Sequence, residues 1–418
     1  MIRYLALGLA FVASVILSGC GGGGGTPNES LVIIAVPGVA QGTNFSFDIS
    51  VVDGAKHRMY FTDRNNKSVD VIDTSTNTFV KQITGGFKGC DTGPTCAGAN
   101  NDKSGPDGIN LITGTTFIYV GDVNSVKIID TTTDTVVKTI TIGGTSGLRA
   151  DEGCYDPDHK IFMINSPGET PPFATFIDVN TQKIIATVLF TDPGTGPAGP
   201  PSAGLEACVY DHATQTFLDN NDGSTANPRG EVDVIPASFV MQGTPAAPVI
   251  LTLPVPTPAN GFKIFPLGAC DPTGLDLGPG TDMAVSCRQG TLQDPLTVQI
   301  LDRTNGTLRA TVPIGGGDQI AYDAPTNRYY LAASRWTSNG LSSGPACTAA
   351  FPCTPVLAII DGATRALVKT QFTGNNAHSV GVDPVTHRVY MPFSSSTAPA
   401  GCVTCDQVPT GGVLVFQE

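Results

Sequence analysis

The chain has 418 residues, of which only 14% are charged, and its formal net charge is −13. This negative balance argues against nucleic acid and anionic lipid headgroups as partners. The 49 glycines, the 32 prolines and the abundant Thr and Val are typical of many short strands joined by turns. No helical periodicity longer than a couple of turns appears beyond the first twenty residues.

The first twenty residues have the pattern of an export signal. Arg3 precedes an apolar stretch from Tyr4 to Leu17, which is too short to span a membrane. The Leu-Ser-Gly-Cys sequence that ends at Cys20 resembles the processing box of bacterial lipoproteins. This resemblance implies that residues 1–19 are a signal peptide and that Cys20 is lipidated. A plain secretory signal with a chance cysteine is the alternative.

Residues 20–30 are expected to link this lipid anchor to a folded body. The run Gly21 to Gly25 is typical of a flexible tether. Gly21 stands where a retention Asp for the inner membrane would sit, so the resemblance favours the outer membrane. We therefore expect a lipid-anchored protein of the bacterial cell envelope.

From residue 31 onwards, the sequence repeats a unit of four short apolar runs. The clearest copy consists of Phe47 to Asp53, Arg58 to Asp63, Val69 to Asp73 and Thr78 to Ile83. Such units cannot bury both faces alone and must stack on their neighbours. The position that ends the first run recurs roughly every 40 to 60 residues, at Asp53, Thr113 (a substitute for the acid), Asp156, Asp211, Asp271, Asp323 and Asp383. The repeats predict an all-β, seven-bladed β-propeller of four-stranded antiparallel blades over residues 31–418.

The two ends of the repeat region complement each other. The last unit stops after its third run at Glu418, whereas an unassigned apolar run, Leu31 to Val36, precedes the first unit. We expect this N-terminal strand to become the fourth strand of blade seven. The ring would then be closed, and its open edges would be covered.

Two of the runs resemble the YVTN-type β-propeller repeat. Tyr60-Phe61-Thr62-Asp63 corresponds to its second strand, and Val71-Ile72-Asp73 to its third. The resemblance is strongest in the first two and last two blades, and it is degenerate in blades four and five. YVTN-type propellers look like relatives of lactonases and streptogramin-lyase-like proteins, which work at the channel mouth, often with a divalent metal.

The eleven cysteines indicate an oxidising compartment, because ten remain once Cys20 is set aside. Proximity and expected strand pairing favour the pairs Cys90–Cys96, Cys154–Cys208, Cys270–Cys287, Cys347–Cys353 and Cys402–Cys405. This connectivity is a hypothesis. The last pair also has the spacing of a redox or zinc pair, but no second pair lies nearby, so a disulfide is favoured.

The connections between runs fall into two classes. Turns after the first and third runs are nearly all short and are expected on one face of the ring. Long insertions are expected on the other face, at residues 85–105, 191–203, 236–266, 335–355 and 394–411. A face elaborated in this way usually carries the binding surface.

One histidine and several acids are expected at the channel mouth on the long-loop face. His57, His159, His212 and His387 lie in short turns, which explain them structurally. His378 instead precedes the closing acid of its run by five positions. The same offset in other units gives acids, except for Pro266 in blade five and Gly108 in blade two; the acids are Asp48, Asp151 with Glu152 beside it, Glu206, Asp318, and Asp107 next to Gly108.

This partial ring of carboxylates has two interpretations. Clustered oxygens suit Ca²⁺ or another hard divalent cation, and a histidine admits a transition metal. In that case Asp48, Glu206 and Asp318 are the predicted ligands and His378 is the predicted acid–base group. Alternatively, the acids form a solvated rim and pair with Arg149, Arg288 and Arg335. Arg335 and Trp336 could also form an exposed recognition patch, although Trp336 could equally pack on its blade.

Two functional classes follow. The leading hypothesis is a non-catalytic binding or scaffold module that contacts a protein or polysaccharide through the long-loop face. The alternative is a metal-assisted, lactonase- or lyase-like enzyme with its site at the channel mouth. Electron transfer or quinone-dependent oxidation lacks support, because histidines are few and no haem motif exists.

Overall fold

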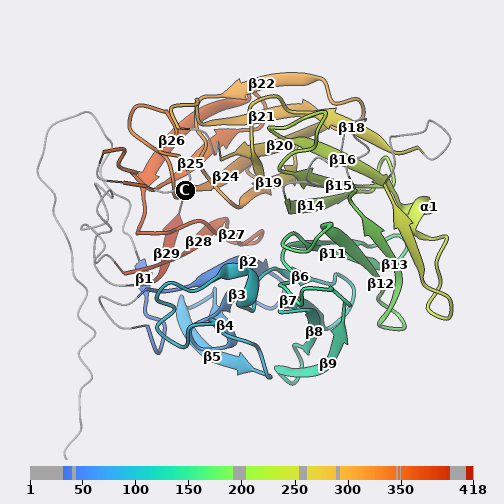
Figure 1. Cartoon of the computed structure of the whole chain (residues 1–418). Helices are drawn as coiled ribbons and strands as arrows, with labels where there is room; N and C mark the ends of the chain where they lie inside the picture. The colour runs from blue at the N-terminus through green and yellow to red at the C-terminus, as the bar shows by residue number, and fades with distance from the viewer. Residues whose placement is uncertain are drawn as a thin grey trace, which may run out of the picture.

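The structure is a computed structural model that describes residues 32–39, 44–191, 204–253, 261–288, 292–344, 347–348, 350–395 and 411–417. These residues form seven β-sheets in a ring, which is a β-propeller (Figure 1). The predicted fold is confirmed. The helices in the described part are one turn of 3₁₀-helix, η1 (Asn101–Lys103), and the four-residue α1 (Ala237–Val240). None of them is long and apolar enough to cross a membrane.

Each blade contains four antiparallel strands, numbered from the ring axis outward. Blades one to three consist of β2 (Phe47–Asp53), β3 (Arg58–Asp63), β4 (Ser68–Asp73) and β5 (Thr78–Thr84); β6 (Ile109–Leu111), β7 (Phe117–Asp122), β8 (Ser125–Asp130) and β9 (Thr135–Thr141); and β10 (Gly153–Asp156), β11 (Ile161–Ser166), β12 (Phe173–Asp178) and β13 (Lys183–Leu189). Blades four and five consist of β14 (Leu205–Asp211), β15 (Thr216–Asn221), β16 (Glu231–Pro236) and β18 (Lys263–Pro266); and β19 (Pro272–Leu277), β20 (Asp282–Cys287), β21 (Thr297–Asp302) and β22 (Leu308–Val312). Blades six and seven consist of β23 (Ile320–Asp323), β24 (Arg328–Ala333), β25 (Val356–Asp361) and β26 (Ala366–Phe372); and β27 (Gly381–Val382), β28 (Arg388–Phe393), β29 (Gly412–Gln417) and β1 (Val32–Ile34).

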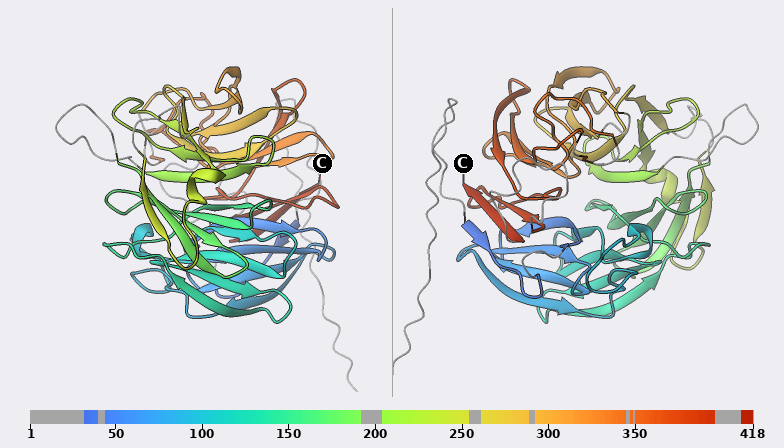
Figure 2. Two further views of the ribbon diagram at one scale, coloured as in Figure 1. Left: turned by 90° about the vertical axis from the view of Figure 1, so that its right-hand side faces the viewer. Right: turned by 60° about the vertical axis from the view of Figure 1, so that its left-hand side comes forward.

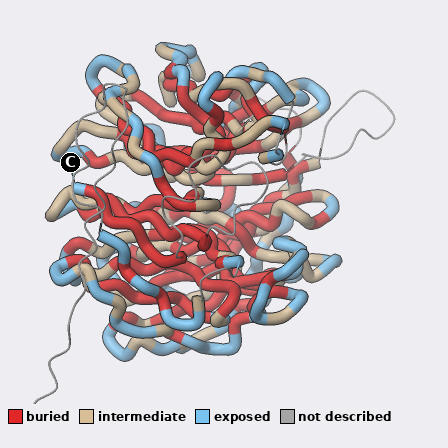
Figure 3. Tube along the Cα trace, turned by 90° about the vertical axis from the view of Figure 1, so that its left-hand side faces the viewer, coloured by how far each residue is buried: buried red, intermediate tan, exposed pale blue. Residues whose placement is uncertain are grey.

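The apolar core lies between blades rather than in one central mass. Each of the seven core clusters among the described residues combines side chains of two neighbouring blades. Second and third strands are therefore buried on both faces, whereas an outer strand such as β26 alternates between exposed and half-buried residues. Figure 3 shows the buried segments in the interior and the exposed turns at the periphery. This packing explains why the inner runs read as almost continuous apolar sequence.

The recurring acids close turns. Asp73 Oδ1 accepts hydrogen bonds from the backbone N–H groups of Ser75 (2.8 Å) and Thr76 (3.0 Å). The acids that end other third strands accept from Thr132, Thr181, Thr304 and Thr364 in the same way. The repeat is thus visible in the sequence because each blade needs the same Asp-based turn.

The N-terminal strand closes the ring, as predicted. β1 pairs antiparallel with β29, in the register Val32 with Val415 and Ile34 with Val413 (Figure 2). Ile34 and Val36 are 5% and 4% exposed and pack into the cluster between blades seven and one. The edge of blade seven is therefore covered.

A second set of contacts joins the same seam near the ring axis. Gln319, next to β23 of blade six, donates from Nε2 to the backbone oxygen of Ser50 in blade one (2.9 Å). Its Oε1 accepts from Ser379 Oγ (2.7 Å) and from the backbone of Val380 (2.9 Å) in blade seven. One side chain thus connects three blades.

The insertion after β16 does not join the other long loops, so that prediction was wrong. β16 ends at the short-turn face, where the Ala237 N–H donates to the oxygen of Gln215 in the turn between β14 and β15 (3.0 Å). From there the insertion carries α1 and β17 (Val249–Thr252) to blade three, where β17 pairs parallel with β13 as a fifth strand. The reason is chain direction, because third strands run away from the channel mouth.

The alignment of blade five was also wrong. Asp271 precedes β19 instead of ending it, and Pro266 ends β18 of blade four. Gly278 takes the place of the closing acid: its N–H donates to the Asp282 oxygen (2.9 Å), as Asp383 donates to Arg388 (2.9 Å). The turn in this blade is built from Gly and Pro, so it left no acid to align.

Four predicted disulfides are present, namely Cys90–Cys96, Cys154–Cys208, Cys270–Cys287 and Cys347–Cys353. The Cys154–Cys208 bond joins the first strands of blades three and four. Cys402 and Cys405 lie outside the described residues, as do Cys20, the signal sequence and the tether.

Candidate functional site

A cavity of about 230 Å³ lies at the end of the ring where the first strands begin. Its wall is almost wholly polar or charged and comes from all blades except blade four's outer part and blade two's strands. It is lined by Asn44, Ser46, Phe47, Asp48, Arg64, Asn101, Arg149, Asp151, Glu152, Glu206, Arg288, Gly316, Gly317, Asp318, Ser334, Arg335, Asn376 and His378.

The predicted mouth residues converge because first strands lie innermost and start at this end. Asp48 and Glu206 are the second residues of β2 and β14, and Asp318 lies just before β23. Of the residues predicted to bind or react, all but two line the cavity. Asp107 is fully buried behind the wall, and Trp336 packs against the core between blades five and six.

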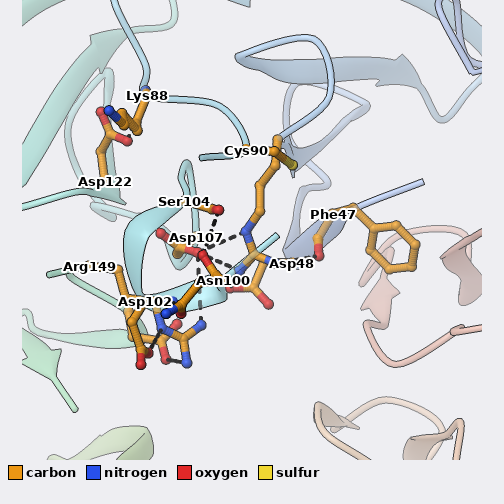
Figure 4. A network of polar contacts seen from close by, with 12 residues as sticks. Phe47, Asp48, Lys88, Cys90, Asn100, Asp102, Ser104, Asp107, Asp122 and Arg149 are labelled. Carbon is orange, nitrogen blue, oxygen red and sulfur yellow. Dashed lines mark hydrogen bonds and ion pairs between the residues drawn. The ribbon is translucent and has the colours of Figure 1, made fainter. Parts of the chain in front are cut away.

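One side of the mouth is an ion-pair network around Arg64, whose side chain is 3% exposed. Its Nη2 lies 2.9 Å from Asp48 Oδ2, and its Nε donates to Asp107 Oδ1 at 2.9 Å. Arg149 extends the network, with Nη2 2.8 Å from Asp151 Oδ2. Figure 4 shows Asp107 between Asp48 and Arg149. On this side, three carboxylates face two guanidinium groups.

The network splits the proton affinities of its acids. Burial raises the pKa of Asp48, but the charge of Arg64 and a hydrogen bond from His378 outweigh it and hold the pKa well below the usual range. For Asp107, burial outweighs Arg64 and Arg149, and the pKa is raised. Burial likewise raises the pKa of Asp151 to about 7, despite Arg149. Asp48 is therefore the permanently ionised acid of this side.

The other side of the mouth carries more negative charge. Oxygens of Glu152, Glu206 and Asp318 all lie within 4.8 Å of one another. The nearest cation is Arg288, whose Nη2 is 3.6 Å from Glu206 and 3.7 Å from Asp222. Burial and the neighbouring acids raise the pKa values of Glu152 and Glu206.

The acidic groups of the mouth could hold a metal ion, and charge balance favours one of them. Ca²⁺ takes oxygens at about 2.3–2.6 Å, so ligand atoms on one ion are at most about 5 Å apart. The group of Glu152, Glu206 and Asp318 meets this limit, as do two groups that include Asp48. On the Glu152 side, however, four acids (with Asp222) face only Arg288 and Arg335, which leaves two negative charges. Of the three predicted ligands, Glu206 and Asp318 belong to this group, Asp48 does not, and Glu152 takes its place.

His378 links the two sides. Its Nε2 lies 3.6 Å from Asp48 Oδ1, and its Nδ1 is 2.8 Å from the backbone oxygen of Asn376. The ring stacks on Phe47, with centroids 4.6 Å apart and an interplanar angle of 8°. Burial lowers the pKa of His378, but Asp48 and Asp318 outweigh it and raise the pKa above the ordinary value.

Sequence reasoning missed Arg64 and Asp222 as mouth residues. Both stand directly after a second strand, and so do Arg288 and Ser334 in blades five and six. Second strands run toward the mouth, so the residue that follows each one arrives there. A charged residue at this position was the available signal.

The histidines in the short turns have structural partners. His159 Nδ1 lies 2.7 Å from Asp156 Oδ2, and His387 Nδ1 lies 2.9 Å from Asp323 Oδ2. Both acids end or close a first strand. The interpretation of these histidines as turn residues agrees with these contacts.

A buried acid pair in blade one makes stability depend on pH. Burial raises the pKa of Asp63 to about 6, and burial with the charge of Asp63 raises that of Asp70. A raised pKa means that the folded protein holds the proton more tightly than the unfolded chain. We expect stability to be highest below about pH 4 for this pair and to fall by roughly 3 kcal/mol as pH rises through 6. Chemical denaturation at pH 5 and pH 8 in a chelator measures the slope, and Asp70→Asn should flatten it; an equal slope in that variant would contradict the assignment.

The comparisons with known proteins bear on the fold. No protein-family model matches the sequence, and none of the curated proteins matches it. Among solved structures, hydrazine synthase from Kuenenia stuttgartiensis is similar, with a TM-score of 0.59 and 12% sequence identity over 90% of this chain and 96% of that chain. At this identity, the similarity shows the fold alone.

Proposed function

We propose that this protein is a non-catalytic binding module of the bacterial cell envelope. It holds a divalent cation such as Ca²⁺ at the channel mouth and binds a polysaccharide or protein partner on that face. The observation that carries the proposal is the group of Glu152, Glu206 and Asp318, whose oxygens lie within 4.8 Å of one another beside too few cations. Carboxylate oxygens are the ligands that Ca²⁺ prefers.

The loops around the mouth support a preformed binding surface. The Cys90–Cys96 disulfide braces the loop after β5, and Asn101 from that loop lines the cavity. The loop after β24 carries the Cys347–Cys353 disulfide, and the Thr354 N–H donates to the Trp336 oxygen (2.6 Å). Rigid loops lower the entropic cost of binding.

Calorimetric titration with Ca²⁺ tests the proposal. We expect one ion per chain, with Kd on the order of 10⁻⁴ to 10⁻³ M, as in extracellular Ca²⁺ modules. Asp318→Asn should weaken binding at least about tenfold, because it removes one charged ligand. Asp178→Asn, which changes a turn acid on the opposite face, should bind Ca²⁺ like the wild type. No Ca²⁺ binding by the wild type at millimolar concentration would refute the proposal.

The envelope location rests on the lipoprotein-like sequence at Cys20 and is supported by the disulfides, which persist in oxidising compartments. We propose a lipid anchor in the outer membrane. Metabolic labelling with a fatty acid and membrane fractionation test it: the Cys20→Ser variant should lose both the label and the membrane association. Label that persists in this variant would exclude Cys20 as the anchor.

A lactonase- or lyase-like enzyme is the second candidate, favoured by His378. Its Nδ1 contact with the Asn376 oxygen fixes the ring, so that Nε2 faces Asp48 beside the acidic group. A histidine held in this way could transfer protons next to a bound cation. Hydrolysis of a lactone by the wild type, abolished in His378→Ala, would assign this function in place of the first.

A further inference from the structure

Arg335 differs from the other arginines of the mouth. Arg64, Arg149 and Arg288 each lie within 4 Å of a carboxylate oxygen. Arg335 also lines the cavity, but its guanidinium makes no ion pair or hydrogen bond with any side chain in the described ranges. A cation at the wall of a polar cavity without a carboxylate partner is available to an anionic ligand.

The backbone fixes where Arg335 enters the cavity. Its N–H donates to the Gly316 oxygen (2.9 Å), and the Gly316 N–H donates to the Cys287 oxygen (3.0 Å). Gly316 has φ +71°, and a Cβ there would lie 2.9 Å from the Arg335 carbonyl carbon. Only glycine allows this close approach, so Arg335 starts from a well-defined position.

The surroundings of Arg335 favour an added negative charge. Burial and the like charge of Arg288 lower its pKa, and the more distant Asp318 and Glu206 compensate only partly. An anion against the guanidinium would form charge-assisted hydrogen bonds, which are stronger than neutral ones and can be bidentate with a carboxylate.

The acidic group lies on the same cavity wall. Three protein carboxylates leave several of the six to eight coordination positions of Ca²⁺ open. A ligand carboxylate can therefore contact the cation and Arg335 together. The remaining wall offers amide and hydroxyl groups, from Asn44, Ser46, Asn101, Ser334 and Asn376. These groups suit ligand hydroxyls better than apolar surface.

We propose that the mouth binds a hydroxylated carboxylate, with Arg335 as the anion-recognition residue. The ligand is an acidic sugar, either free or as the end residue of an acidic polysaccharide. A cavity of about 230 Å³ is smaller than the roughly 300–1,000 Å³ of pockets for drug-sized ligands, which agrees with a single sugar unit. This inference rests on the proposed function, because the cation supplies half of the recognition.

Calorimetry on the full chain loaded with Ca²⁺ tests the inference, with galacturonate as the probe and galactose as its neutral counterpart. We expect galacturonate to bind and galactose to bind at least about tenfold more weakly, since only galacturonate carries the charge. Arg335→Gln should weaken galacturonate binding at least about tenfold and leave Ca²⁺ binding unchanged. Arg58→Gln, on the short-turn face, should alter neither.

Each outcome separates the two proposals. If Ca²⁺ itself does not bind, the proposed function fails. If Ca²⁺ binds but galacturonate and trigalacturonate do not, or if Arg335→Gln keeps full affinity, only the present inference is overturned. Tighter binding of trigalacturonate than of galacturonate assigns a polysaccharide end, whereas equal binding assigns the free acid; both support the inference.

Discussion

Removal of residues 32–36 is expected to lower the free energy of unfolding by about 3–6 kcal/mol. The segment buries Ile34 and Val36 between blades seven and one, and each buried side chain of this size contributes about 1.5–3 kcal/mol. It also supplies the three strand pairs that cover β29. Without it, blade seven would expose the edge of β29, and we expect aggregation as well as a lower Tm. Denaturant unfolding and light scattering measure the two effects.

Two neighbouring residues of β1 provide a matched control. Ile33 is 42% exposed, whereas Ile34 is 5% exposed, although both take part in the pairing with β29. Ile34→Ala should cost about 2–5 kcal/mol, as for other buried Ile side chains, and Ile33→Ala should cost well under half of that. Equal effects of the two substitutions would mean that β1 does not seal the seam by burial.

Arg64→Ala is the second change with a large expected effect. The substitution would leave Asp48 and Asp107 buried without their principal cation, and breaking a buried ion pair costs about 3–5 kcal/mol. Arg58→Ala is the control, since its side chain is 30% exposed and pairs with Asp134 at 2.9 Å on the opposite face. Exposed pairs contribute about 0–1 kcal/mol. Urea denaturation of both variants gives the comparison.

A double variant shows whether the loss comes from uncompensated charge. Arg64→Met together with Asp107→Asn removes one positive and one negative charge from the network. We expect it to be more stable than Arg64→Met alone, because Asp107 no longer lacks a partner. A double variant that is less stable than the single one would show that packing of the Arg64 side chain, rather than its charge, stabilises the mouth.

The sequence was sufficient for the ring because each blade uses the same local device. Asp73 and its counterparts close turns through their own backbone neighbours, so the signal recurs wherever a blade recurs. It failed in blade five, where Gly278 forms the turn without an acid. The closing strand was also predictable, because blade seven lacked a strand and an apolar run was left over at the other end.

The mouth was predictable in position but not in pairing. Strand direction places Asp48, Glu206 and Asp318 at one opening. Whether each acid has a cationic partner depends on residues such as Arg64 and Arg288, which arrive from second strands far away in the sequence. The path of the insertion after β16 was beyond reach for the same reason, since its contact with β13 belongs to another blade.

The parallel pairing of β17 with β13 makes the ring mechanically uneven. Blades three and four share this strand, and the Cys154–Cys208 bond crosslinks them covalently on the axial side. The seam across the circle, between blades seven and one, is closed on the outside by only the three residues of β1. Thermal opening should therefore begin at the β1 seam, with blades three and four exchanging their amide protons last and as a single cooperative unit.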